Sequence, residues 1–207
     1  MGNTGFMILY LRYLLTIFIL ILIFQSWTNA DNIRELEIEG IVIGDSLLDH
    51  FSKQEIKSEM VSSVKYNYLN DPDKFTHVEF VQHSSLKIYD SIQIFVKNNP
   101  GKYEIFGIIG KLYFIKNINE CAPKRDQIVN DLKLVLKKIE ASDPIIKSHP
   151  ADKSGESKVD QIAFWFNNDD LVIAECYDWS EKMGYYDNLK VNILTDEVNK
   201  WLIDVKK

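Results

Sequence analysis

The sequence predicts an α+β fold, in which two or three helices pack against an antiparallel sheet. Two segments, 91–110 and 160–177, alternate apolar and polar residues on either side of an Asn-rich turn, as β-hairpins do. Other segments carry apolar residues at helical spacing behind residues that cap helices. Apolar residues make up 46% of the chain, enough to bury an ordered core.

The first predicted element is a strand over residues 33–43, in which Gly40 marks a bend or bulge. Its apolar residues are Ile33, Leu36, Ile38, Ile41 and Ile43. A short helical turn follows over residues 45–51, and either Asp45 or Ser46 caps it.

A helix is predicted to begin at Ser52 and to end at about Met60 or Ser63. Ser52 and Glu55 have the spacing of a capping box, in which each side chain bonds the other's backbone N–H. Phe51 and Ile56 occupy the two positions of a hydrophobic staple around it.

The two predicted hairpins match each other in the order of their elements and in the Asn-Asn of their turns. Their alternating apolar residues are Ile92, Ile94 and Val96 in the first, and Ile162, Phe164 and Phe166 in the second. Each hairpin also follows a predicted helix. The chain is therefore either a pair of pseudo-repeated helix-and-hairpin halves, or it contains two hairpins that are alike only in general pattern.

Two further helices are predicted, one before the second hairpin and one at the end of the chain. The first spans residues 123–141 and is stopped by Pro144. The last begins after Thr195, its cap, and carries acidic residues in its first turn. Its predicted buried stripe is Val198, Trp201, Leu202 and Val205.

Residues 1–30 have the pattern of a secretory signal peptide. The stretch 6–24 is apolar except for Arg12 and Thr16, and small residues precede a cleavage point after Ala30. The alternative is an uncleaved anchor, since the apolar stretch approaches the roughly 20 residues that span a bilayer. The sequence thus predicts export to the periplasm or cell exterior, with residues 31–207 as a single domain.

The charge balance argues against nucleic acid as a partner. Without Arg12, the mature chain holds 23 basic and 30 acidic residues, a formal net charge of −7. Lysines and acids are interspersed, so no basic stripe is available to neutralise phosphates. Contact with a membrane is expected only if the N-terminal segment is uncleaved.

Gly44-Asp45-Ser46-Leu47 resembles the first block of the GDSL serine hydrolases, which suggests Ser46 as a nucleophile. In that family an Asp-x-x-His near the C-terminus completes the site, and no Asp lies three residues before any of the four histidines here. A serine hydroxyl needs a base within hydrogen-bond reach. We therefore interpret Ser46 as a helix cap and keep the serine hydrolase as the alternative.

Neither a metal site nor a cofactor is predicted. His77, Glu79 and His83 share one side if their segment is a strand, but residues i and i+6 of a straight strand lie about 20 Å apart. Cys121 and Cys176 are the only two cysteines, and export would place them in an oxidising compartment. We therefore predict a disulfide between them.

The segment 142–160 is predicted to be a long loop, and such loops are usually functional or disordered. It mixes stiffening residues with side chains of both charge signs, a composition suited to a small polar or anionic ligand. Aromatic residues of the following segment 176–186 supply its wall, with Asp178 as a polar anchor. The candidate ligand-binding residues are His149, Asp152, Lys153, Ser154, Asp178, Trp179 and Tyr185, with Tyr186 beside them. The alternative is a solvated linker.

Most of the mature chain resembles a group of uncharacterised exported proteins from marine bacteria with AT-rich genomes. The resemblance is carried by IEGIVIGDSLLDHFS, YDSIQIFVKNN, KSHPADKSGES and CYDWSEKMGYYDNLKV. It implies export and assigns no activity. The segment GIVIGDSLLDHF is also similar to the helix starts of small helix-and-sheet modules in bacterial envelope proteins, which implies protein binding. The predicted function is a non-enzymatic binding module for a small polar ligand or an envelope protein.

Overall fold

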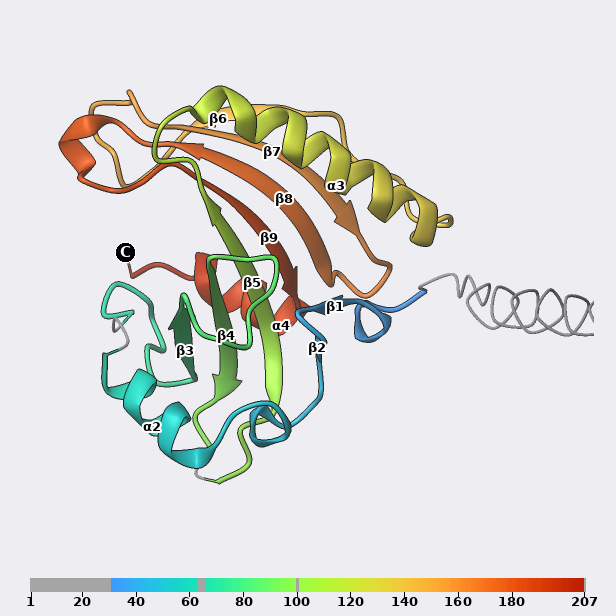
Figure 1. Ribbon diagram of the computed structural model, residues 1–207, viewed down its shortest axis with the longest axis vertical. Coiled ribbons are helices and arrows are strands. Elements are labelled where there is room, and N and C mark those ends of the chain that lie inside the picture. The colour runs from blue at the N-terminus through green and yellow to red at the C-terminus, as the bar shows by residue number, and fades with distance from the viewer. Residues whose placement is uncertain (1–30, 63–65, 100, 207) are drawn as a thin grey trace, which may run out of the picture.

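The protein is described by a computed structural model over residues 31–62, 66–99 and 101–206. A seven-stranded antiparallel sheet has the order β3-β4-β5-β9-β8-β7-β6, and a separate two-stranded ladder joins β1 and β2 (Figure 1). The sheet strands are β3 (Phe75–Val81), β4 (Ser91–Lys97), β5 (Ile105–Tyr113), β6 (Ile145–Ser148), β7 (Lys158–Trp165), β8 (Leu171–Asp178) and β9 (Asn188–Leu194). With helices on the sheet, the predicted α+β class is confirmed.

The helices are α2 (Lys53–Ser62), α3 (Cys121–Val135) and α4 (Asp196–Ile203). Short 3₁₀ turns η1 (Ile33–Glu35), η2 (Leu47–Asp49), η3 (Ile118–Glu120) and η4 (Glu181–Met183) connect the elements. Among these described residues, no helix has the length and apolar character needed to cross a membrane. The predicted signal peptide or anchor, residues 1–30, lies outside the described part of the chain.

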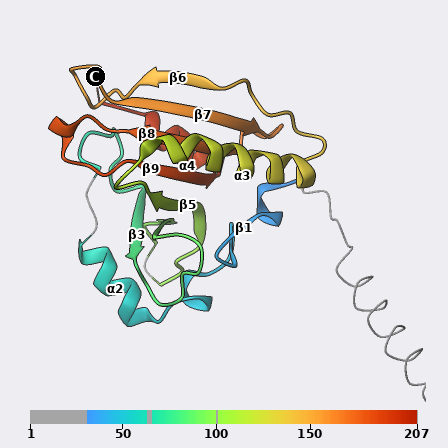
Figure 2. The ribbon, with the colours of Figure 1, turned by 45° about the horizontal axis from the view of Figure 1, so that its top comes forward.

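The sheet has two faces, which we call the helical face and the polar face. On the helical face, α2, α3 and the β1–β2 ladder pack over alternate residues of the strands; Figure 2 shows α3 lying along β8 and β9. On the polar face, α4 covers one part of the sheet and packs Val198 and Trp201 against Phe75, Phe95 and Leu194. The two faces follow from the period of two in side-chain direction along each strand.

Residues 37–42 form a hairpin behind the 3₁₀ turn η1, where a single strand over 33–43 was predicted. Strands β1 (Glu37–Ile38) and β2 (Ile41–Val42) pair across a two-residue turn at Glu39 and Gly40. Both turn residues have positive φ, 56° and 77°, as the hairpin turn that matches strand twist requires. The predicted bend at Gly40 is therefore a reversal of the chain, and all five predicted apolar residues are still buried.

The local signals around Ser52 are confirmed in detail. Ser52 N donates to Glu55 Oε2 at 2.8 Å, and Glu55 N donates to Ser52 Oγ at 3.3 Å, which is the predicted capping box. Phe51 and Ile56 are both buried. At the other end of the chain, Thr195 Oγ1 accepts from Val198 N at 3.3 Å and caps α4 as predicted.

Helix α3 begins and ends earlier than its pattern predicted, at Cys121 and Val135 and not at 123 and 141. Proline is tolerated in the first turn of a helix, where its missing N–H has no helical partner, so Pro123 does not mark the start. At the C-terminal end Leu136 leaves the helical conformation, and a turn keeps its side chain buried. The predicted stop at Pro144 is therefore wrong.

Part of the predicted loop 142–160 is strand β6, which pairs with β7 at the edge of the sheet. All four residues of β6 are exposed, so this strand has no buried face. Its sequence therefore lacks the alternation of apolar and polar residues from which a strand is predicted. The last helix also differs from its predicted stripe. Val205 lies beyond α4 and is 52% exposed, while Val198 and Trp201 are buried as predicted.

The two predicted halves correspond to two meanders, each of which follows a helix. The β3–β5 meander follows α2, the β6–β9 meander follows α3, and the two join where β5 pairs with β9. The second meander has one strand more than the first. The element order thus agrees with two halves, and a true duplication stays a prediction.

Helix α3 is joined to the sheet by the predicted disulfide. Cys121, the first residue of α3, is bonded to Cys176 on β8, so this prediction is confirmed. Both cysteines are buried in the core of the helical face. A disulfide is consistent with folding in an oxidising compartment.

Candidate functional site

An open pocket of about 490 Å³ lies on the polar face where β5, β9 and the loops at their ends meet. Its volume is in the range of small-molecule sites. The described residues that line it are Lys111, Tyr113, His149, Ala151, Trp179, Gly184, Tyr185, Tyr186, Asn188 and Lys190. We call it the aromatic pocket.

Two lysines lie side by side in the floor of the aromatic pocket. Lys111 on β5 and Lys190 on β9 are direct cross-strand partners. Like charges directly opposite each other destabilise a sheet unless something offsets them. Lys111, whose side chain is only 13% exposed, pairs with Glu79 on β3 at 2.6 Å.

Lys190 has no such ion pair with any described residue. Its Nζ lies over the Tyr177 ring, 3.8 Å from the centroid, which is a cation–π contact. Burial is the main cause that lowers its pKa to about 8, and the nearby Glu175 only partly opposes this. The pocket floor therefore holds an ammonium group that a bound anion would stabilise.

Glu175, the cross-strand partner of Lys190 on β8, already has hydrogen-bond donors of its own. Its carboxylate accepts from Asn192 Nδ2 at 2.9 Å and from the Tyr177 hydroxyl at 3.1 Å. Burial raises the pKa of Glu175, so its negative charge is disfavoured at this position. The positive charge of Lys190 is therefore only partly compensated by Glu175.

Asn188 also lines the pocket, and the oxygen of its side chain is enclosed by the protein. Its Nδ2 donates to the Tyr186 carbonyl at 2.8 Å, which fixes the orientation of the amide. Its Oδ1 is buried and has no hydrogen-bond partner among the described residues, and the residue is 5% exposed. A buried acceptor without a donor is costly, but this oxygen has less than 1 Å² of accessible surface, so the pocket does not expose it to a ligand.

The wall of the pocket is aromatic. The Trp179 ring lies 4.4 Å from the His149 ring, 4.9 Å from Tyr185 and 5.6 Å from Tyr177, measured between centroids. Burial lowers the pKa of His149, and the charge of Lys190 acts in the same direction, so its ring is mainly neutral at pH 7. The wall thus combines apolar ring faces with few charges.

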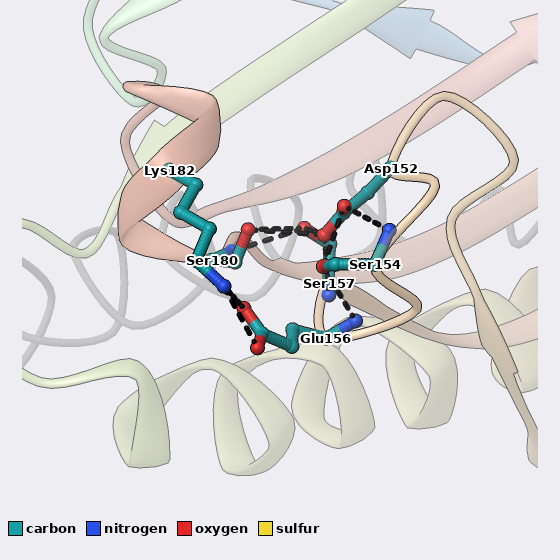
Figure 3. Close-up of polar contacts among 6 residues, drawn as sticks. All are labelled: Asp152, Ser154, Glu156, Ser157, Ser180 and Lys182. Carbon is teal, nitrogen blue, oxygen red and sulfur yellow. Dashed lines mark hydrogen bonds and ion pairs between the residues drawn. The ribbon is translucent and has the colours of Figure 1, made fainter.

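A network centred on Asp152 holds the β6–β7 loop against the segment that follows β8 (Figure 3). The Asp152 carboxylate accepts five hydrogen bonds, all from Ser154, Ser157 and Ser180. Lys182 and Glu156 add an ion pair at 3.1 Å between the same two segments. The network positions His149 beside Trp179, because His149 N also donates to Ser157 O at 2.9 Å.

We expect Asp152→Asn to speed amide exchange across residues 149–157. The hydrogen bonds from the three serines hold the pKa of Asp152 well below its ordinary value of about 3.9, because they stabilise the charged form. A depressed pKa stabilises the fold above the unfolded-state pKa, and this contribution is lost as the pH falls toward the folded-state value. The difference between wild type and variant should therefore be present at pH 7 and shrink below about pH 4.

The control for this exchange experiment is Asp143→Asn, because Asp143 is an exposed carboxylate outside the network. Equal exchange rates for the loop in wild type and Asp152→Asn at pH 7 would show that the network does not order it.

The structure brings three of the predicted ligand-binding residues to one place: His149, Trp179 and Tyr185 line the aromatic pocket, with Tyr186. Asp152 and Ser154 belong to the hydrogen-bond network of the β6–β7 loop and do not line the pocket. Lys153 and Asp178 are exposed and do not line the pocket.

Sequence reasoning missed Lys111, Tyr113, Asn188 and Lys190. A signal was present in β9, where Asn188, Lys190 and Asn192 alternate with apolar residues. That alternation places them on one face of a strand, but only the pairing of β9 with β5 brings Lys190 beside Lys111.

Ser46 occupies the cap position that was predicted. Its Oγ accepts from Leu48 N at 3.3 Å and caps η2. His50 Nε2 lies 3.2 Å from Asp45 Oδ2, and no hydrogen bond joins Ser46 Oγ to a histidine among the described residues. The hydroxyl is thus engaged with the backbone, and the hydrolase alternative gains no geometric support.

We expect Ser46→Ala to lower the free energy of unfolding by about 0.5–2 kcal/mol, the usual effect of losing an N-cap. Urea denaturation measures this, and Ser46→Asp, which keeps an acceptor, should restore most of it. The wild type should not be labelled by a fluorophosphonate. Esterase activity that disappears in a folded Ser46→Ala protein would contradict the cap interpretation.

The histidines considered for metal binding are separated. His77 is buried on the polar face beside the Tyr66 and Phe95 rings, and burial lowers its pKa. His83 lies 3.3 Å from Glu55 and 2.8 Å from Ser85. Within residues 31–62, 66–99 and 101–206, no three His, Cys, Asp or Glu side chains form a group that could hold a metal ion.

Comparisons with family models, with curated proteins and with solved structures found no match to this chain.

Proposed function

We propose that the protein is a non-enzymatic binding module for a small organic anion, which it binds in the aromatic pocket. The observation that carries the proposal is the Lys190 ammonium, which has no ion-pair partner among the described residues and lies opposite a second lysine. An anion beside Lys190 would add to the partial compensation that Glu175 provides. The aromatic wall would cover the apolar part of the same ligand.

Export belongs to the same proposal. It is supported by the signal-peptide pattern of residues 1–30, by the resemblance to exported proteins, and by the disulfide. We infer that the module acts in the periplasm or outside the cell, on a ligand that reaches it there.

The test is an NMR amide-shift titration with cyclohexanecarboxylate, a ring that carries one carboxylate, against cyclohexanol as its neutral counterpart. The carboxylate should shift the amides of β5, β9 and the 179–187 segment, and cyclohexanol should bind more weakly. Lys190→Met should weaken carboxylate binding by roughly 10-fold or more, the usual loss of a charge-assisted hydrogen bond. Lys153→Met, an exposed lysine outside the pocket, is the matched control.

Binding of the anion should also weaken as the pH rises through about 8, because Lys190 then loses its proton. The charged groups around it are Glu175, Lys111, Glu79 and His149. Among them His149 is already mainly neutral at pH 7, so its own titration should contribute little above that pH. If neither cyclohexanecarboxylate nor any other ring carboxylate binds in a Lys190-dependent way, the proposed function is wrong.

A further inference from the structure

We propose that the Lys190 amine is a nucleophile, which forms a reversible imine with a small ring-bearing aldehyde that enters the aromatic pocket. This goes beyond the proposed function, because the aldehyde reacts with the neutral amine and needs no negative charge. Three observations carry the inference: the absence of a hydrogen bond to Lys190 Nζ, the second lysine beside it, and the aromatic wall.

The Lys190 amine lines the pocket without a hydrogen-bond or ion-pair partner among the described residues. Its Nζ lies over the face of the Tyr177 ring, 3.8 Å from the centroid, and a ring face is only a weak hydrogen-bond acceptor. The Glu175 carboxylate instead accepts from Asn192 Nδ2 and from the Tyr177 hydroxyl. When Lys190 loses its proton, no described donor occupies the lone pair, and it is available to attack a carbonyl carbon.

The two lysines of the pocket floor have different surroundings. Lys111 donates to Glu79 at 2.6 Å, so its ammonium has an opposite charge in contact. Lys190 is the direct cross-strand neighbour of Lys111, and a like charge disfavours its protonated form. Burial acts in the same direction and more strongly, Glu175 and Glu79 oppose it, and the pKa of Lys190 is lowered to about 8. A buried lysine whose pKa is lowered in this way is the kind that forms imines with carbonyl compounds.

The step needs no oxidant or reductant. The neutral Lys190 amine adds to the aldehyde carbon, so that a C–N bond forms, and the carbonyl oxygen gains the first proton that the nitrogen loses. The resulting hydroxyl leaves as water with the second proton of the nitrogen, and a C=N bond remains. The pocket is open, so solvent relays these protons, and water reverses the reaction.

The wall of the pocket favours an aldehyde that is attached to a ring. Trp179 and Tyr185 meet nearly edge to face with their centroids 4.9 Å apart, and Tyr185 and Tyr186 are more than 60% exposed. These exposed rings offer surfaces on which a flat ring can stack. Stacking would hold the aldehyde in the same pocket as the amine, and holding two reactants together accelerates their reaction.

The experiment traps the imine on the folded protein obtained by expressing the full chain. The protein is incubated at pH 7 with benzaldehyde and sodium cyanoborohydride, and peptide mass spectrometry locates the alkylated lysines. We expect Lys190 to be trapped at least about 10-fold faster than the exposed Lys153, because a lysine in water has a pKa of about 10.4 and is almost wholly protonated at this pH. Acetaldehyde, which lacks the ring, should show a smaller preference for Lys190.

The pH dependence of trapping distinguishes Lys190 from a surface lysine. The ratio of trapping at Lys190 to trapping at Lys153 should fall from pH 7 to pH 9, because the neutral fraction of Lys190 saturates above about pH 8 while that of a lysine in water keeps growing. The charged and titratable groups that face Lys190 are Glu175 and Tyr177 on β8, Lys111 on β5, Glu79 on β3 and His149 in the β6–β7 loop. Burial raises the pKa of Tyr177 and lowers that of His149, so neither changes charge over this range.

Lys111→Met tests the role of the second lysine. Removing its charge leaves Glu79 near Lys190, so the pKa of Lys190 should rise and trapping at pH 7 should slow by about 10-fold. Lys102→Met, an exposed lysine in the β4–β5 turn, is the matched control and should leave the rate unchanged. If the Lys111 variant does not fold, the ratio of Lys190 to Lys153 in the wild type decides alone.

The outcomes separate this inference from the proposed function. Trapping at Lys190 no faster than at Lys153, or a ratio that does not change with pH, would overturn the reactive amine. If Lys190-dependent binding of cyclohexanecarboxylate is then still observed, the anion site stands without it. Fast trapping at Lys190 together with no binding of any ring carboxylate would support the reactive amine and overturn the proposed function.

Discussion

Replacing Cys121 and Cys176 by alanine should lower the free energy of unfolding by about 4 kcal/mol, because the disulfide closes a segment with a sequence separation of 55. The unfolded chain without this link has more conformations to lose on folding. Both cysteines are buried, and alanine is smaller and apolar, so the substitution introduces no charge. Urea denaturation of wild type and variant, at equal pH and salt, measures the difference.

The control for the disulfide is the reductant itself. Reduction should destabilise the wild type by a similar amount and leave the Cys121→Ala/Cys176→Ala protein unchanged. Mass spectrometry after alkylation should find no free thiol in the oxidised protein. Equal midpoints for wild type with and without reductant, with complete reduction shown by mass, would contradict the expected contribution.

Arg125→Ala should cost at most about 3–5 kcal/mol of stability, the range for removing one partner of a buried ion pair, because Arg125 is buried while the Asp160 side chain is 25% exposed. Arg125 lies one turn after Cys121 on α3, and its side chain is 5% exposed. Its guanidinium pairs with Asp160 on β7, which is the cross-strand partner of Cys176. The disulfide and this ion pair therefore fix the start of α3 to neighbouring positions on the sheet.

Two further variants test whether the loss of stability comes from leaving Asp160 without its partner. Arg125 also bonds the exposed Asp126, at 2.8 Å, and Asp126→Asn should cost no more than about 1 kcal/mol, as for surface pairs. Arg125→Met combined with Asp160→Leu removes both charges of the pair, the buried Arg125 and the partly buried Asp160, and should recover much of the lost stability. A double variant as unstable as Arg125→Ala would mean that packing, and not an unpaired Asp160, causes the loss.

The disulfide and the Arg125–Asp160 ion pair lie close enough for each to affect the contribution of the other to stability. Cys176 and Asp160 face each other across β8 and β7, so loss of the disulfide should change the cost of losing Arg125. Contacting residues commonly show such coupling in double-mutant cycles.

The sequence alone determined those features that depend on neighbours along the chain. The capping box at Ser52, the caps at Ser46 and Thr195, and the alternation of β4 and β7 each need only a few adjacent residues to act. The disulfide was also predictable, because two cysteines allow one intramolecular pairing. These local signals predict the correct fold class, although they predict a bend within one strand at Gly40, where the structure has a hairpin turn.

The features that sequence reasoning missed depend on partners far away along the chain. Every residue of β6 is exposed, and the segment is a strand only because its backbone pairs with β7. Helix α3 stops at Val135 although its apolar spacing continues. The chain turns at Leu136, and this turn keeps the Leu136 side chain buried. In both places tertiary pairing overrides a weak local preference.

The residues of the candidate site also divide into those that the local sequence predicts and those that only the tertiary structure brings together. The aromatic wall at Trp179 and Tyr185 and the nearby His149 were predicted from composition within a short segment. Its floor was not, because Lys111 and Lys190 lie far apart in the sequence and meet only where the two meanders join at β5 and β9. The local sequence thus specifies which residues alternate on each strand. The order of the strands decides which charged residues face each other. That order could not be predicted locally, because pairing between strands is set by the packing of the whole core.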